Sequence, residues 1–486
     1  MSTARTAIVA ADGVFTYDDL DAASRRVAGC LLDGRDDLEQ ARVAFLVAPS
    51  FAYVAVQRGI WRAGGVAVPL AVSHPPPELE HVITDAAASV VVADDAFAPV
   101  AAALAQASGA RFVTTAEALR ASPADDPPHL GSRRRAMIVY TSGTTGRPKG
   151  VVTTHENIGA QIASLVEAWG WQPTDRMLLA LPLHHVHAII NGLGCPLAVR
   201  ASVEILPAFD PEAVWDRLAS GAITVFTAVP TMYSRLVASW NAAPPEVRRA
   251  RSDGVRRVRL MMSGSAPLPV ALFERWREIT GHTLLERYGM TEIGMALSNP
   301  LDGERRPGTV GQPLPGVEVR IVGDDGRPVP DGTPGELEVR GPTVFLEYWQ
   351  RPEETRAAFR DGWFRTGDVA VADRGYYRLL GRTSVDIIKT GGWKVSALEI
   401  EEVLRTHPSI AECAIVALPD AEWGERVAAA LELRPGAAPL ALDELQQWAR
   451  LRLAPYKLPR ALRIVSGLPR NTLGKVLKPE VARLFK

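Results

Sequence analysis

The chain has 486 residues, of which 47% are hydrophobic and 22% are charged, and its formal charge is -1 at pH 7. This length is about three times that of a usual domain, so two or three lobes with large cores are expected. The composition argues against a disordered chain, and the near-neutral charge gives no electrostatic signature of binding to DNA or to an anionic membrane.

Cysteine usage and the N-terminal sequence indicate the compartment. The three cysteines are widely separated and show no metal-ligand or CxxC spacing, which is typical of a reducing environment. No signal-peptide core opens the chain, and Pro49 and Ser50 interrupt the apolar stretch 43–56 well short of a membrane span. We therefore expect a cytoplasmic protein without a membrane or nucleic-acid partner.

In the first part of the chain, short β-rich apolar runs alternate with amphipathic stretches such as 18–32. This alternation predicts an α/β fold of layered, mostly parallel sheets and helices. The Ala-rich stretch 97–107 is expected to be a helix. The expected strands are 43–47, 65–70, 89–93, 136–140, 177–181 and 223–229.

From about Pro307 the chain becomes rich in Gly and Pro, which is typical of a small antiparallel β subdomain. The stretch 375–392 then leads into a helix signalled by the S-x-x-E pattern of Ser396 and Glu399. The rest predicts an α+β unit with strands 410–418 and 427–433 and a helix near 443–453. We therefore expect an N-terminal domain of residues 1–381 and a smaller C-terminal domain of residues 382–486.

The segment YTSGTTGRPKG at 140–150 follows an expected strand. Its glycines, its four hydroxyl side chains after Tyr140 and Lys149 give a flexible, donor-rich loop suited to wrapping a polyphosphate. The spacing is not that of a Walker A loop. A solvated turn has the same composition when such a loop is taken alone. Only seven of the 54 basic residues are lysines, which draws attention to Lys149 and Lys475 as compact, flexible cations.

This loop resembles the signature loop of the adenylate-forming superfamily, which comprises acyl-CoA synthetases, nonribosomal-peptide adenylation domains and beetle luciferases. Further motifs of that superfamily follow in the same order, so the resemblance extends from about Thr16 to the C-terminus. The motifs are LPLHHVHA at 181–188, SGSAPL at 263–268, YGMTE at 288–292, GWFRTGD at 362–368, YRLLGR at 377–382 and PRNTLGK at 469–475.

The resemblance implies a mobile C-terminal lid and a reaction in two steps. A carboxylate attacks the α-phosphate of MgATP to form an acyl-AMP and pyrophosphate, and the thiol of CoA then displaces AMP. Lys475 would bridge the carboxylate and the α-phosphate. Thr291 would contact the α-phosphate, and Glu292 would ligate Mg²⁺, which prefers hard oxygen ligands. These three residues are the expected catalytic residues.

The resemblance also assigns residues to ATP and CoA. Asp368 would accept hydrogen bonds from the two ribose hydroxyls, and Arg382 would pair with ribose or phosphate oxygens. A glycine pair at 391–392 would let the C-terminal lobe approach the pantetheine arm. The full expected set is Thr141, Ser142, Gly143, Thr144, Thr145, Lys149, Ser265, Ala266, Pro267, Glu286, Tyr288, Gly289, Met290, Asp368, Arg382, Gly391, Gly392 and Trp393.

Members of the superfamily run the two steps in two orientations of the small lobe, pivoting just after the Gly-Arg that is Gly381 and Arg382 here. The pivot is therefore expected at 383–385, where Ser384 and Val385 replace the Asp or Lys of many relatives. The segment ending at Lys475 also resembles an acetylation site, so an acetyltransferase and a deacetylase are expected partners. Acetylation would block adenylation and spare the thioester step.

The acid substrate is indicated by Arg287, beside the acyl pocket of the superfamily. Its planar guanidinium can hold a second carboxylate in a bidentate pair. The strings SGSAPLP, LLERYGMTE and SNPLDGERRPGTVG look closest to malonyl-CoA synthetases, in which this arginine binds the distal carboxylate. We expect malonate, and also methylmalonate, to bind Arg287, His187, His185 and Ser263. Arginine fills about one position in ten, so an arginine that points away from the pocket remains an alternative.

Four other functions remain open on the sequence. The protein could be a CoA ligase for a small monocarboxylic acid, or a stand-alone enzyme that adenylates an acid and loads a carrier protein. An amino-acid-activating domain would usually place an Asp for the substrate amine, and no clear equivalent is evident. A noncatalytic nucleotide-binding scaffold and an oxidising luciferase are the remaining alternatives.

Overall fold

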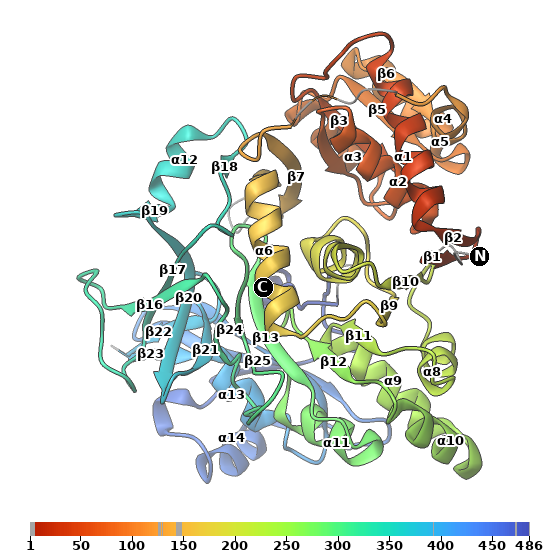
Figure 1. Ribbon diagram of the computed structural model, residues 1–486. Helices are drawn as coiled ribbons and strands as arrows, with labels where there is room; N and C mark the ends of the chain where they lie inside the picture. Colours follow the sequence, from red (N-terminus) through yellow and green to blue (C-terminus); the bar gives the residue numbers. More distant parts are fainter. Residues whose placement is uncertain are drawn as a thin grey trace.

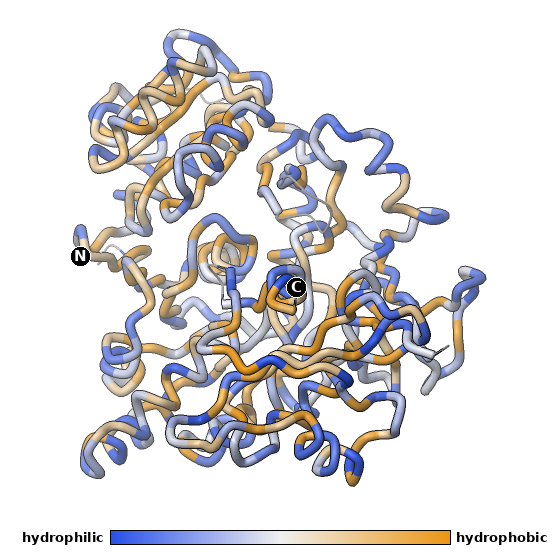
Figure 2. Tube along the Cα trace, turned by 180° about the vertical axis from the view of Figure 1, so that it is seen from behind, coloured by the Kyte–Doolittle hydropathy of each residue, from blue (hydrophilic) through white to orange (hydrophobic). Residues whose placement is uncertain are grey.

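The computed structural model describes residues 5–124, 128, 130–141, 148–391, 393–471 and 474–485. The described residues form two large sheets, a small antiparallel sheet and a C-terminal sheet, with helices packed around them (Figure 1). The hydrophobic segments run through the strands and the inner turns of the helices, whereas the outer loops are hydrophilic (Figure 2). The α/β architecture expected from the alternating pattern is confirmed.

The nine-stranded sheet carries most of the candidate site. Its central strands β10, β9, β11, β12 and β13 are parallel, so their carboxyl ends meet at one edge. Helices α8 (Pro211–Ala219), α9 (Pro230–Ala242), α10 (Pro245–Val255) and α11 (Val270–Thr280) cover one face, where Trp215, Tyr233 and Trp276 pack together. In spatial order the strands are β15 (Gln312–Pro313), β14 (Gly294–Ser298), β13 (Leu285–Met290), β12 (Leu260–Ser263), β11 (Val225–Ala228), β9 (Arg176–Leu179), β10 (Ser202–Ile205), β1 (Thr6–Ala10) and β2 (Gly13–Thr16).

The other face of this sheet packs on α6 (His155–Ala168) and on η2 (His187–Gly194), a π-helical segment that continues into α7 (Cys195–Ala198). A π-helix is rare and is frequent at functional sites, where its extra residue per turn redirects side chains. Nothing in the sequence marks this segment beyond His187. It lies over the strands that carry the motifs at 263–268 and 288–292.

The seven-stranded sheet is parallel from β7 to β6 and antiparallel at the β8 and β18 edge. Helices α1 (Tyr17–Leu32), α2 (Phe51–Arg62) and α5 (Thr115–Arg120) pack on one face, and α3 (Pro76–Asp85), η1 (Asp95–Phe97) and α4 (Ala98–Ser108) lie on the other side. In spatial order the strands are β18 (Glu347–Tyr348), β8 (Lys149–Thr154), β7 (Arg135–Thr141), β4 (Val66–Pro69), β3 (Arg42–Leu46), β5 (Val90–Ala93) and β6 (Arg111–Thr114).

The small sheet expected after Pro307 and the C-terminal α+β unit are both present. The small sheet contains β16 (Glu318–Val322), β17 (Gly335–Arg340), β20 (Trp363–Asp373), β19 (Phe359–Arg360) and β21 (Tyr376–Arg382), with α12 (Pro352–Ala357) beside it. The C-terminal unit contains β22 (Ile387–Thr390), β23 (Trp393–Ser396), β24 (Ile410–Asp420), β25 (Gly424–Leu433) and β26 (Ala461–Ile464), with α13 (Ala397–Leu404), α14 (Leu442–Arg450), η3 (Pro455–Lys457) and α15 (Lys478–Arg483).

One local expectation is only half fulfilled. Ser396 caps α13, because its hydroxyl accepts the backbone N–H of Glu399 at 3.2 Å. The reciprocal bond of a capping box is missing, since the Glu399 carboxylate pairs with Lys457 at 2.5 Å. The ion pair with Lys457 has therefore replaced the local hydrogen bond from the Ser396 backbone N–H to Glu399.

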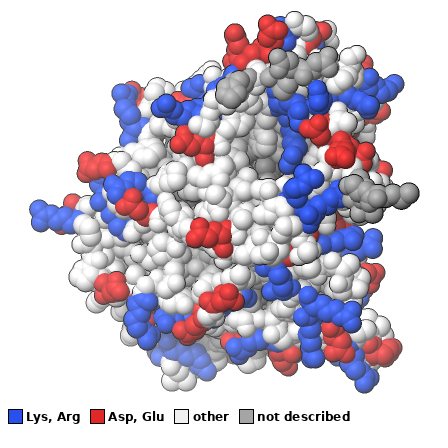
Figure 3. Space-filling view, in the orientation of Figure 1, with Lys and Arg blue, Asp and Glu red and all other residues white. Residues whose placement is uncertain are grey.

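The surface of the molecule is mixed in charge. On the face shown in Figure 3, basic and acidic side chains are interspersed around a centre that carries few charges. Within the described part of the chain, no helix is both long enough and apolar enough to cross a membrane.

Candidate active site

The residues expected near the phosphates are joined through a tyrosine. Lys149 opens β8, and its Nζ lies 3.0 Å from a carboxylate oxygen of Glu354 and 4.1 Å from the ring centroid of Tyr348. The Tyr348 hydroxyl donates a hydrogen bond of 3.0 Å to Oε1 of Glu292. Burial raises the pKa of Glu292, while the Tyr348 hydrogen bond and the charges of Arg382 and Lys149 act in the opposite direction. Lys149 and Glu292, which are far apart in sequence, therefore both contact Tyr348.

Asp368 is the centre of a second group. Tyr288 donates its hydroxyl to Oδ2 of Asp368 at 2.5 Å, and Nε of Arg382 donates to Oδ1 at 3.0 Å. Burial and the Asp368 charge raise the pKa of Tyr288 well above its usual value, so the phenol remains a neutral donor. Burial acts to lower the pKa of Arg382, but the charge and hydrogen bond of Asp368, together with Tyr288 and Glu292, raise it above its usual value. A carboxylate offers about four acceptor positions, so Asp368 can still accept from further hydroxyls.

Lys475 reaches this second group from the C-terminal lobe. The preceding Gly474 has a φ of 75° and lies so close to Thr231 of α9 that a Cβ would stand 2.5 Å from the threonine hydroxyl. The Lys475 side chain is exposed to solvent. Burial and then the charge of Arg382 lower its pKa, and nearby carboxylates, including Asp368, partly compensate.

Arg287 is a buried cation within β13. Its side chain is 2% exposed, and Nε, Nη1 and Nη2 have no hydrogen-bond partner among the described residues. The guanidinium lies against Gly264, where a Cβ would stand 2.3 Å from Nη1. Burial lowers the pKa of Arg287 to about 9, and Tyr233 and Glu286 act in the opposite direction. Since a buried charge is costly without a partner, this geometry is that of an anion site.

His187 approaches the same place from η2. Its Nε2 lies 2.7 Å from the Thr227 hydroxyl and its Nδ1 lies 3.0 Å from the Ser265 hydroxyl. Burial, followed by the charge of Arg287, lowers the pKa of His187 well below its usual value. The imidazole is therefore neutral and can exchange donor and acceptor roles with these hydroxyls.

Two more polar side chains complete this wall. Ser263 ends β12 and is fully buried, and its hydroxyl has no partner within the described ranges. Asn191 lies four residues after His187 in η2, is also fully buried, and both its amide atoms lack partners there. Gly192, its neighbour, faces Leu179 of β9, so this side of η2 faces the sheet. Unpartnered polar groups thus gather between η2 and the strand ends.

Most of the expected residues lie in these groups or directly beside them in the chain. Glu286 faces the opposite side of β13 from Arg287 and accepts the backbone N–H of Leu268 at 3.2 Å. Burial raises the pKa of Glu286 to about 8, and Glu402 of the C-terminal lobe adds to this. The residues in or beside the groups are Thr141, Lys149, Ser263, Ser265, Ala266, Pro267, Arg287, Tyr288, Gly289, Met290, Thr291, Glu292, Asp368, Arg382, His187 and Lys475.

Other expected residues lie elsewhere. His185 is partly buried and its ring contacts His184, and burial lowers the pKa of His185 to about 4. Gly391 packs on Trp423, and Trp393 stacks on Tyr456 at 4.5 Å within the C-terminal lobe, where it stays 54% exposed. The expected ligands Ser142, Gly143, Thr144, Thr145 and Gly392 lie outside the described residues.

Three residues of the site were not expected from the sequence. Tyr348 links Lys149 to Glu292 but lies in the apolar string FLEYW, where nothing marks a polar role. Asn191 could have been noticed as the one amide in the otherwise apolar run AIINGLG. Gly264 belongs to a motif that was recognised, yet only the structure shows that its missing side chain makes room for Arg287.

Comparison with known proteins agrees with this geometry. Residues 2–349 match the family model described as AMP-binding enzyme, and residues 399–475 match the AMP-binding enzyme C-terminal domain. The mitochondrial malonate–CoA ligase of Homo sapiens is 46% identical over 519 residues, which cover 99% of this chain and 90% of that protein.

Solved structures agree with the family models over nearly the whole chain. ATP-bound MatB from Rhodopseudomonas palustris is 37% identical and superposes with a TM-score of 0.92, covering all of this chain and 97% of that one. The apo form of the same protein, with the same identity and coverage of 99% and 96%, gives a TM-score of only 0.80. The present structure thus superposes more closely on the ATP-bound form than on the apo form. The chain belongs to the AMP-binding enzyme family.

Proposed function

We propose that the protein is an ATP-dependent malonate–CoA ligase, which forms malonyl-AMP and then malonyl-CoA and also accepts methylmalonate. The observation that carries this proposal is the buried Arg287, whose three guanidinium nitrogens have no acceptor among the described residues. A second carboxylate on the acid supplies that acceptor in a bidentate, charge-assisted pair. The relatives named malonate–CoA ligase and MatB support the same substrate.

The neighbours of Arg287 suit a short diacid. Ser263 and Asn191 offer unpartnered hydrogen-bonding atoms to the distal carboxylate, and neutral His187 adds no repulsive or competing charge. The hydrogen bond between His187 and Thr227 closes this end of the site. Long-chain and aromatic acids would have to break that bond and would leave the guanidinium unpaired, which costs free energy.

In the first step an oxygen of the carboxylate that is not bound to Arg287 attacks the α-phosphorus of ATP. The bond between the α-phosphorus and the oxygen bridging to the β-phosphate breaks, and pyrophosphate leaves. Lys475 lies beside Arg382 and Asp368, where its ammonium would offset the repulsion between the two anions. Thr291 would donate to an α-phosphate oxygen. Mg²⁺ fits Glu292, because this ion is commonly held by one or two carboxylates together with substrate phosphates, whose charge it neutralises.

In the second step the sulfur of CoA attacks the acyl carbon, and AMP leaves with the electron pair of the broken C–O bond. A lobe of residues 382–486 would turn about 383–385 to bring Gly391, Gly392 and Trp393 toward the pantetheine arm of CoA and to withdraw Lys475. Acetylation of Lys475 would remove its charge and stop the first step only.

The test is the acid profile. Formation of the CoA thioester is measured with malonate, methylmalonate, acetate, benzoate and octanoate at saturating MgATP. Malonate should give the highest kcat/KM, followed by methylmalonate. A preference for any monocarboxylic acid would refute the proposal, and formation of acyl-AMP without a CoA thioester would favour loading of a carrier protein.

Two variants then test whether the Arg287 guanidinium determines the preference for malonate. Arg287→Leu should lower kcat/KM for malonate by about 10²-fold or more, since loss of one partner of a buried charge pair costs roughly 2–5 kcal/mol. Turnover of acetate should change much less. Arg249→Leu is the matched control, because Arg249 is an exposed arginine of α10 outside the site. Equal losses for malonate and acetate in Arg287→Leu would contradict the assigned role.

A further inference from the structure

A second cavity lies on the far side of η2 from His187. Its volume is about 480 Å³, within the range of small-molecule sites, and it opens between α2, α6 and the segment from η2 to α7. None of the residues assigned above to ATP, CoA or the acid lines it. Its apolar wall includes Val54, Ile158, Ile162, Ile189, Ile190 and Leu193.

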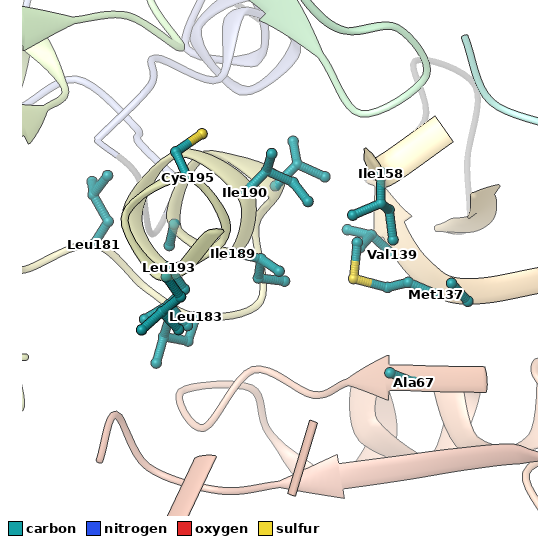
Figure 4. Close-up of a cluster of buried hydrophobic side chains, with 14 of the residues drawn as sticks. Ala67, Met137, Val139, Ile158, Leu181, Leu183, Ile189, Ile190, Leu193 and Cys195 are labelled. Carbon is teal, nitrogen blue, oxygen red and sulfur yellow. The ribbon is translucent and has the colours of Figure 1, made fainter. Parts of the chain in front are cut away.

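The winding of η2 separates this cavity from the candidate active site. His187 and Gly192 face the nine-stranded sheet, whereas Gly194 faces Ile162 of α6. Ile189 and Ile190 project from the same side as Gly194, and Figure 4 shows Ile190 directed toward Ile158 of α6. One helical segment therefore forms a wall of both spaces.

Two polar groups of α2 enter the apolar cavity. Gln57 is 4% exposed, and its Nε2 has no acceptor within the described part of the chain. The Arg58 guanidinium also lines the cavity, and no hydrogen bond or ion pair holds it among the described residues. Burial lowers the pKa of Arg58, Tyr17 opposes this shift, the charge of Arg62 adds to it and Asp21 opposes it. The neighbouring Arg62 is already paired with Asp21 at 2.5 Å.

These features define the chemistry of a ligand. An apolar body would cover the aliphatic wall, and a single anionic group would meet Arg58 and the amide of Gln57. A neutral hydrocarbon would leave the guanidinium desolvated without a partner, which is unfavourable. A polyanion such as a nucleotide would find one available cation, because Arg62 is engaged by Asp21. A carboxylate with a hydrocarbon chain meets each requirement.

We propose that this cavity is a binding site for a medium-chain monocarboxylate, with the carboxylate on Arg58 and Gln57 and the chain between α6 and η2. The site is separate from the one that activates the substrate acid. Ligand and substrate can therefore be bound at the same time.

The test is calorimetric titration of the full-length protein with octanoate, octan-1-ol and octylamine, with and without saturating malonate and ATP. Octanoate should bind with one site per chain, and its Kd should change less than about threefold when malonate and ATP are present. Octylamine should bind at least tenfold more weakly than octanoate. Absence of saturable binding up to about 5 mM, displacement by malonate and ATP, or equal binding of octylamine would each overturn the proposal.

Variants locate the ligand. Arg58→Met keeps an unbranched side chain and removes the charge, so octanoate should bind at least tenfold more weakly while octan-1-ol is unaffected. Arg26→Met, at an exposed position of α1, is the matched control. Ile162→Trp fills the cavity and should abolish binding of both ligands. Should this variant unfold, Arg58→Met still decides the matter, because unchanged octanoate affinity in it would refute the site.

Discussion

The contact between Gly264 and Arg287 allows a test of the acid site that leaves the arginine in place. In Gly264→Ala the new Cβ would stand 2.3 Å from Nη1 and 2.5 Å from Cζ, whereas ordinary contacts begin at about 3.4 Å. The guanidinium must therefore retreat by about 1 Å, and β13 must also shift, because the Cβ would stand 2.8 Å from the Arg287 carbonyl oxygen. Both displacements lengthen a hydrogen bond to the acid beyond its useful range. Since a hydrogen bond to a charged group contributes roughly 1.5–3 kcal/mol, KM for malonate should rise about 10- to 100-fold.

The assay compares malonate with acetate at fixed MgATP, together with thermal unfolding of each variant. KM for acetate should change less than about threefold, because acetate has no distal carboxylate to meet Arg287. The control is Gly159→Ala in α6, where a Cβ would have no neighbour within 4 Å. That variant should keep wild-type kinetics and gain about 0.5–1 kcal/mol of stability. A folded Gly264→Ala enzyme whose KM for malonate stays within twofold of wild type would refute the reasoning.

Four more perturbations probe the other groups. Lys475→Ala should slow malonate-dependent ATP–pyrophosphate exchange about 10²- to 10³-fold while thioester formation from supplied malonyl-AMP continues, and equal losses would contradict its role. Arg287 is charged below its pKa of about 9 and neutral above it, so KM for malonate should rise as the pH passes 9, and this break should vanish in Arg287→Leu. Tyr348→Phe removes a bond that lowers the pKa of Glu292, so the acid limb of kcat/KM for MgATP should move to higher pH, and an unmoved limb would argue against the link. Glu402→Ala removes the acceptor for the first N–H of α11, at 2.9 Å across the lobes, so pyrophosphate exchange should fall about twofold or more while thioester formation from malonyl-AMP does not.

The fold could be read from the sequence because its central strands are buried on both faces. Such strands appear as continuous apolar runs, and β3, β4, β5, β7 and β11 each lie within two residues of the expected range. The helix α4 also begins and ends within one residue of the expected limits. The π-helical winding at 187–194 could not be predicted, since it depends on how the segment packs between α6 and the sheet.

The site residues that lie in sequence motifs could be predicted, whereas the residues whose role depends on tertiary packing could not. Lys149, Asp368 and Lys475 stand in short polar strings whose order along the chain is distinctive. Tyr348 acts through partners that come from two other segments, and Asn191 matters because its buried amide has no partner among the residues that the structure describes. The burial of a polar group without a hydrogen-bond partner is a property of the folded state, so no local sequence pattern predicts it.

Adjacent residues of β13 show how the site can select a diacid. Glu286 and Arg287 project from opposite faces of the strand, so they cannot pair, and burial pushes both toward their neutral forms, with pKa values of about 8 and about 9. The protein has therefore already removed the guanidinium from water before the acid arrives. A diacid regains that desolvation cost through its distal carboxylate, whereas a monoacid leaves the cation buried and unpaired. Selectivity then arises as much from the cost of the wrong substrate as from the contacts of the right one.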